Sequence, residues 1–203
     1  MAAQSNLKNM VMVLGLTCLL CSAILGGAYA LTKEPIDAAA VAKTNKAIGA
    51  VLPAFDETIY ESVDVDGKTY NYYKAERGGE TVGYAVESTV VGFGGPLSLM
   101  VGVTPDGVVH NTSVLSHAET PGLGAKITQE AFLKSCEGQK LYDKKGDFVS
   151  VRVLKSGTSS EIAEENRVDA ISGATITSRG VDEMMREITP IVKNVPLQPD
   201  NKE

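Results

Sequence analysis

The sequence predicts an α+β protein with a single transmembrane helix at its N-terminus. Three observations support this: an uncharged apolar run near the N-terminus, a central region of β-branched strands separated by Gly-containing turns, and a helical apolar pattern near the C-terminus. The 203 residues suffice for one hydrophobic core and an anchor. We expect a mostly antiparallel sheet built from two or three hairpins, with the C-terminal helix packed on it.

The composition excludes several classes of protein. The formal charge is −6, the pI is near 5.1 and no basic cluster is present, which argues against nucleic acid as a partner. Cys18 and Cys21 lie inside the apolar run, so Cys136 is the one cysteine left for the soluble part and no disulfide framework can form there. His110 and His117 stand too isolated to predict a metal site or a hydrolytic triad.

Residues 10–30 form the predicted transmembrane helix. This run holds no charged residue, and about twenty apolar residues span a bilayer. A cleaved signal peptide is the alternative, because Lys8 precedes the run and Ala28-Tyr29-Ala30 resembles a cleavage site. We favour the retained helix, because the run is longer than the apolar region of a typical signal peptide.

The charges on either side of this helix predict its orientation. Lys8 and the amino terminus lie on one side, whereas Lys33 on the other side is offset by Glu34 and Asp37. We therefore expect residues 1–9 to stay in the cytoplasm and the bulk of the chain to lie across the membrane.

Residues 31–55 are expected to form a juxtamembrane helix. Pro35 suits a first helical turn, and Ile36–Val51 is Ala-rich with Lys43 and Lys46 spaced through it. Pro53 should end the helix. We interpret this segment as a stalk without chemistry.

A first hairpin follows. Thr58–Asp64 and Lys68–Ala75 are predicted strands, and Asp66-Gly67 is a typical tight turn between them. The tyrosines of the second strand are interpreted as packing residues, with Tyr70 and Tyr72 on one face and Tyr73 on the other.

Thr81–Val91 is predicted to be a buried strand, and Gly92–Pro96 then ends it. We interpret the glycine cluster as a bend that could admit a ligand ring or another backbone. It is not a dinucleotide-binding motif, because a run ending in Gly-Gly-Pro cannot open the required helix. Leu97–Thr104 and Val108–Ser116 form the second predicted hairpin, around Pro105-Asp106-Gly107.

Beyond the hairpins the predicted elements are shorter. Ile127–Cys136 is expected to be helical with Thr128 as a possible cap, and Cys136 is interpreted as a packing residue. A charged turn at 144–147 leads into a predicted strand, Phe148–Leu154. Residues 156–166 are expected to form a surface loop or a short helix over Glu161–Asn166, and residues 194–203 a flexible tail.

The segment Asp169–Thr175 precedes the C-terminal helix. It is a hydroxyl-rich turn, and Thr177 or Ser178 could cap the helix, with Asp182 in its first turn. Hydroxyl and backbone N–H groups at a helix N-terminus suit a phosphate, but from the residues alone an ordinary capped helix start is the favoured interpretation, because hydroxyl caps are common. The helix has one apolar face, which comprises Val181, Met184, Met185, Ile188, Ile191 and Val192.

A second informative loop runs from His117 to Lys126. Pro121 restricts the backbone, while Gly122 and Gly124 permit conformations in which N–H groups converge on a ligand. From the residues alone a rigid turn is the favoured interpretation, and a ligand-binding loop is the alternative.

Two motifs resemble those of a known family. Asp169 and Ser172–Thr175 match the Asp-x-x-Ser/Thr-Gly-Ala-Thr signature of the FMN-binding domain found in the G subunit of the Rnf complex and in the C subunit of the sodium-pumping NADH:quinone reductase. Glu119–Gly124 resembles a second recurrent segment of that family, which lines the flavin site. The resemblance extends over nearly the whole chain, and the length is more similar to the Rnf protein.

The resemblance implies a covalent cofactor. It assigns the FMN-binding domain to residues 56–193, a phosphoester between FMN and Thr175, and recognition by an FAD-using flavin transferase to Asp169. Neither a catalytic residue nor a metal ligand is implied. The further residues expected to contact FMN are His117, Glu119, Thr120, Gly122, Leu123, Gly124, Lys126, Ser172, Gly173, Ala174, Ile176 and Thr177.

The implied function is electron transfer at the cell inner membrane. The resemblance predicts an FMN carrier that works with other membrane subunits of a complex linking ferredoxin oxidation and NAD reduction to ion translocation, with no complete activity alone. Glu119 and Asp169 would position groups rather than act as acid–base catalysts. Two alternatives stay open: an anchored extracytoplasmic binding module without covalent flavin, and a free-standing extracellular electron-transfer flavoprotein.

Overall fold

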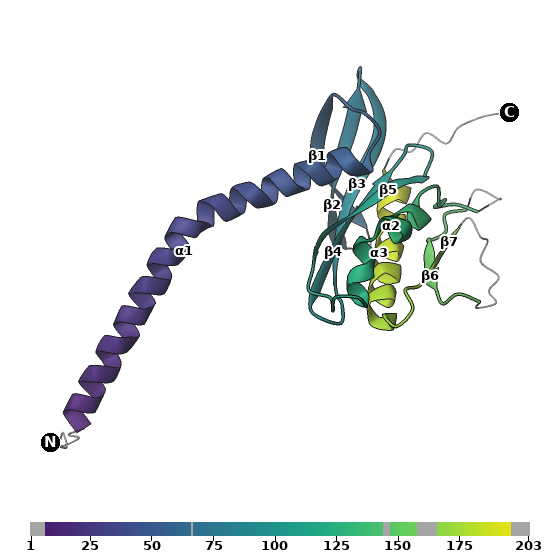
Figure 1. Cartoon of the computed structure of the whole chain (residues 1–203). Helices are drawn as coiled ribbons and strands as arrows, with labels where there is room; N and C mark the ends of the chain where they lie inside the picture. Colours follow the sequence, from purple (N-terminus) through teal and green to yellow (C-terminus); the bar gives the residue numbers. More distant parts are fainter. Residues whose placement is uncertain (1–6, 66, 144–146, 158–165, 196–203) are drawn as a thin grey trace. The chain divides into compact units, whose positions relative to one another are not determined.

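The computed structural model describes residues 7–65, 67–143, 147–157 and 166–195. The chain divides into two units, residues 1–43 and 44–203, and each is described by itself (Figure 1).

Helix α1, Leu7–Val51, accounts for the described part of the first unit and continues into the second. One stretch of it has a mean hydropathy of 2.2 with no buried residue, so by length and composition it can cross a membrane. The juxtamembrane helix predicted for residues 31–55 is not a separate helix: it is the second part of α1, which contains Pro35 and ends at Val51. The ring of Pro35 removes one backbone donor, and the helix-forming residues on both sides continue the helix.

The second unit is built on a five-stranded antiparallel sheet in which each strand pairs with the next along the chain. The predicted antiparallel pairing and both hairpins are confirmed; Asp66, in the first predicted turn, lies outside the described residues. The strands are β1 Glu57–Val65, β2 Lys68–Arg77, β3 Glu80–Val91, β4 Pro96–Val103 and β5 Val109–His117.

Apolar clusters cover both faces of this sheet. Because side chains alternate along a strand, Tyr84 and Val86 join one cluster while Ala85 between them joins the other. The predicted separation of the tyrosines is confirmed, since Tyr72 packs in the first cluster and Tyr73 against the second. The first cluster includes all six residues of the apolar face predicted for the C-terminal helix.

The helices on that face are α2, Glu130–Cys136, and α3, Thr175–Asn194, and a short 3₁₀-helix η1, Gly124–Thr128, precedes α2 (Figure 1). The prediction of a single helix over Ile127–Cys136 is thus wrong for its first residues, because Ile127 and Thr128 belong to η1. Gln129 is the N-cap of α2, and the Thr128 hydroxyl donates to the Ala125 carbonyl instead of capping. Burial raises the pKa of the Cys136 thiol to about 11, as expected of a packing residue.

Helix α3 starts at Thr175, before both of the predicted caps, Thr177 and Ser178. Its N-cap is Ala174 without a side-chain hydrogen bond, so Thr177 and Ser178 lie inside the helix and do not cap it. The Ser178 hydroxyl instead accepts the N–H of Ile171 at 3.0 Å. Asp182 is therefore beyond the first turn.

A small parallel sheet pairs β6, Arg152–Leu154, with β7, Arg167–Asp169. The predicted strand Phe148–Leu154 is reduced to its last three residues, and Phe148 makes an isolated bridge to Tyr142. Asp182 of α3 accepts the Val153 N–H and the Arg152 Nε–H, both at 2.8 Å, and so holds β6 against α3. Predictions for residues 144–146, 158–165 and 196–203 lie outside the described residues.

The end of α1 lies against the second face of the sheet, where Ala47, Ile48 and Val51 are buried. A Cβ atom on Gly102 of β4 would lie 1.8 Å from the Val51 carbonyl oxygen, so only glycine permits this approach. Asn111 Nδ2 donates to the Ala50 carbonyl at 3.0 Å, which satisfies one of the carbonyls left free at the helix end.

Gly102→Ala should therefore lower the free energy of unfolding, by about 1–3 kcal/mol, because the added methyl group forces α1 away from β4. Chemical unfolding of the full-length protein in detergent, followed by circular dichroism, measures this. Gly49→Ala is the control, because it adds the same methyl to α1 where no atom lies within 4 Å. Equal losses in both variants would contradict the close approach.

Candidate functional site

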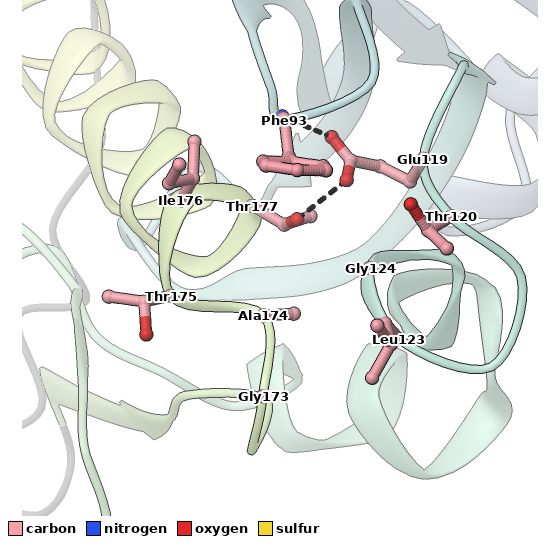
Figure 2. A pocket seen from close by; sticks show the side chains of 10 residues that line it. All are labelled: Phe93, Glu119, Thr120, Leu123, Gly124, Gly173, Ala174, Thr175, Ile176 and Thr177. Carbon is pink, nitrogen blue, oxygen red and sulfur yellow. Dashed lines mark hydrogen bonds between the residues drawn. The ribbon is translucent and has the colours of Figure 1, made fainter.

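A cavity of about 270 Å³ lies where three segments meet (Figure 2). One is the loop after β5, the second is the turn into α3 with its first residues, and the third is the loop between β3 and β4. The lining residues are Phe93, Glu119, Thr120, Leu123, Gly124, Gly173, Ala174, Thr175, Ile176 and Thr177. The structure therefore brings together the two motifs that the sequence analysis singled out.

Glu119 joins these segments. Its carboxylate is buried and accepts two hydrogen bonds, from the Phe93 backbone N–H at 2.8 Å and from the Thr177 hydroxyl at 2.7 Å (Figure 2). Its own N–H donates to His117 Nδ1 at 3.2 Å. A buried carboxylate needs such partners, so these bonds fix the positions of all three segments.

Glycines make room for this carboxylate. A Cβ atom on Gly92 would lie 2.0 Å from Glu119 Oε1, and one on Gly124 would lie 2.3 Å from Oε2. A Cβ atom on Gly94 would lie 1.9 Å from the Ala118 carbonyl oxygen. The glycine cluster predicted as a bend thus packs directly against Ala118 and Glu119.

Apolar side chains surround the cavity. Phe93, Leu123 and Ile176 line it and are 67%, 47% and 47% exposed. Large apolar groups held open to solvent around one cavity are typical of a ligand site, and a flat aromatic ligand could cover them. Sequence reasoning missed Phe93, although an aromatic residue inside a glycine-rich loop was the signal that could have identified it.

Thr175 and Thr177 differ in environment. Thr177 is buried and bonded to Glu119, whereas Thr175, the first residue of α3, is exposed, and the two side chains leave the helix on different sides (Figure 2). The N–H groups of residues 175–177 precede the first intrahelical bond, from Ser178 N to the Ala174 carbonyl. An anion attached at Thr175 would lie near these donors.

The remaining predicted residues do not line this cavity. Ser172 lines a neighbouring cavity, Gly122 adopts φ +77° in the loop, and His117 accepts the Glu119 N–H. The Lys126 side chain is not among the lining residues. Asp169 is the last residue of β7, and its side chain is 62% exposed. Its Oδ1 atom lies 3.6 Å from Arg167 Nη2.

The polar and apolar parts of the site match different parts of a flavin mononucleotide. The exposed side chains provide apolar surface for a ring system, and the exposed hydroxyl and free N–H groups of α3 suit a phosphate. Within the described ranges, no group of three or more His, Cys, Asp or Glu side chains could hold a metal ion.

Thr177→Val should lower the free energy of unfolding by about 1–3 kcal/mol, because it leaves a buried Glu119 oxygen without its hydroxyl donor. Thr175→Val is the matched control in the same helical turn, and removing an exposed hydroxyl should change stability by no more than about 0.5 kcal/mol. Both are measured by chemical unfolding of protein made without flavin. If the two variants lose equal stability, Glu119 does not depend on Thr177.

Comparison with known proteins identifies the region that holds this cavity. The FMN-binding domain family matches residues 92–189. This range begins in the loop that contains Phe93 and extends into α3, so it includes all three segments of the site.

Relatives match nearly the full chain. The G subunit of the proton-translocating ferredoxin:NAD(+) oxidoreductase complex from Clostridium ljungdahlii is 33% identical, over 91% of this chain and 90% of its own. The G subunit of an ion-translocating oxidoreductase complex from Haemophilus influenzae is 32% identical, over 90% and 88%.

A solved structure has the same fold. The C subunit of the Na(+)-translocating NADH-quinone reductase from Parabacteroides distasonis superposes with a TM-score of 0.57 at 29% identity, covering 75% of this chain and 82% of that one. From the identity and coverage of these relatives, the chain belongs to the family of G subunits of ion-translocating oxidoreductase complexes.

Proposed function

We propose that this protein is a membrane-anchored flavoprotein that carries electrons within an ion-translocating complex, with FMN joined to Thr175 through a phosphoester. The observation that carries the proposal is the exposed Thr175 hydroxyl at the edge of an apolar cavity, inside a segment that matches the FMN-binding domain family.

The environment of each hydroxyl favours Thr175 as the attachment point. Thr177 is buried and donates to Glu119, so its oxygen is closed to a modifying enzyme, whereas Thr175 is open. In the proposed modification, the Thr175 oxygen bonds to the FMN phosphorus of FAD, AMP leaves, and the hydroxyl proton is released. A flavin transferase would catalyse this step.

The bound flavin would supply the redox chemistry, since it can pass electrons singly or in pairs, and this chain would supply position and electrostatics. Phe93, Leu123 and Ile176 would exclude water from the ring, and Glu119 would hold the loops that present these side chains. A covalent attachment retains the cofactor outside the cytoplasm, where free FMN is scarce.

The names of the relatives support the wider role, because they are subunits of ion-translocating oxidoreductase complexes and one of these is a ferredoxin:NAD(+) oxidoreductase. We propose that α1 holds this chain in the cell inner membrane beside the other subunits. The charges flanking the helix favour a cytoplasmic N-terminus and a flavin domain on the opposite side.

Thr175→Ala should abolish covalent FMN and leave the fold intact, because it removes an exposed hydroxyl and methyl group. The measurement is the intact mass after co-expression with a flavin transferase, with the modified peptide then located. Thr175→Ser is the control, because it keeps the hydroxyl and should keep the flavin. An unmodified wild-type protein, made beside a control substrate that is modified, would favour a binding module without covalent flavin.

Asp169→Ala should reduce the fraction of protein that carries FMN, if this exposed carboxylate is recognised by the transferase. Arg167→Gln removes the same ion pair from the other side and serves as the control. The two fractions are compared by intact mass at equal transferase levels. Full modification of the Asp169 variant, or an equal deficit in the Arg167 variant, would refute a specific role for the Asp169 carboxylate.

A further inference from the structure

A second cavity, of about 470 Å³, adjoins the first. Thr175 and Gly173 line both, so the proposed attachment point stands between the two. The second cavity is formed between β6 with the residues after it, the turn that follows β7, and the outer side of the first turns of α3. The residues that line it include Arg152, Lys155, Ser172, Thr175, Arg179 and Asp182.

Cations outnumber anions in this lining. Arg152 and Asp182 neutralise each other, with Nε–Oδ1 at 2.8 Å and Nη2–Oδ2 at 3.3 Å. Lys155 and Arg179 are exposed and, in the part of the chain that the structure describes, neither forms an ion pair. The exposed Ser172 hydroxyl lies in the same lining. Within the described ranges, two positive charges without an ion pair and one hydroxyl thus lie in the cavity beside Thr175.

The first cavity has the opposite character. Among its described lining residues there is no lysine or arginine, and its one ionisable side chain is the carboxyl group of Glu119. Its exposed side chains are mainly apolar. An anion attached to Thr175 would therefore be better compensated in the second cavity, while an uncharged ring would be better accommodated in the first.

We propose that the second cavity binds the phosphodiester that joins FMN to Thr175, with Lys155 and Arg179 as its charge partners. This inference rests on the proposed function. It assigns the phosphate to a site distinct from the ring site, and its charge partners do not include Lys126, which was expected to contact FMN but lines neither cavity. The free N–H groups at the start of α3 would add to the same site.

Phosphorus-31 NMR of the flavinylated full-length protein in detergent tests the proposal, because the protein would contain one phosphodiester. Arg179→Gln and Lys155→Gln should each move the single resonance by more than its linewidth, and the double variant should move it further. Arg179→Lys keeps the positive charge and should move it less than Arg179→Gln. In urea all resonances should coincide, which excludes a chemical difference between the samples.

Lys193→Gln is the control. Lys193 lies on the same helix as Arg179, is exposed and lines neither cavity, so the resonance of this variant should stay at the wild-type position. Equal resonance positions in wild type, Arg179→Gln and Lys155→Gln would overturn the phosphate site and leave covalent FMN intact. Complete loss of flavin in both single variants, with unchanged unfolding, would assign these cations to the transferase and also overturn it. A wild-type protein that carries no flavin after co-expression with the transferase would overturn both the covalent attachment and the phosphate site.

Discussion

The pair of hydrogen bonds accepted by Glu119 is the interaction on which the arrangement of the site depends. A carboxylate taken out of water requires donors, and here they come from Phe93 in the loop after β3 and from Thr177 in α3. Gly92 and Gly124 leave the space that this carboxylate occupies. Three segments distant in sequence are thereby held at one cavity, whose outer side chains stay exposed.

The sheet provides the rigid support behind these loops. Its two faces are both covered, one by α2 and α3 and the other by the end of α1, so the strands cannot shift without disturbing a packed cluster. The close approach at Gly102 and the bond from Asn111 attach the end of α1 to β4 and β5. The last turns of α1 are thus part of the domain that supports the site.

Position on α3 explains how two threonines of one turn can serve different purposes. Thr177 faces the buried carboxylate and stabilises the fold, while Thr175 faces outward between an apolar and a cationic cavity. Asp182, further along the same helix, binds β6 and neutralises Arg152. Among the described residues Lys155 and Arg179 form no ion pair, so under the proposed function α3 would contribute to folding, to flavin attachment and, through Arg179, to charge compensation.

The sequence by itself determined the antiparallel strands, the apolar face of α3 and the two motifs, because alternation, helical spacing and turn residues act between near neighbours in the chain. The predictions from sequence were wrong where contacts between residues far apart in the chain determine the local structure. Pro35 was accommodated inside a longer helix, the strand before Leu154 was shortened, and the expected caps became internal helix residues. The tertiary structure alone placed Phe93 at the cavity and separated the surroundings of Thr175 from those of Thr177, since burial and hydrogen bonding arise only when remote segments pack together.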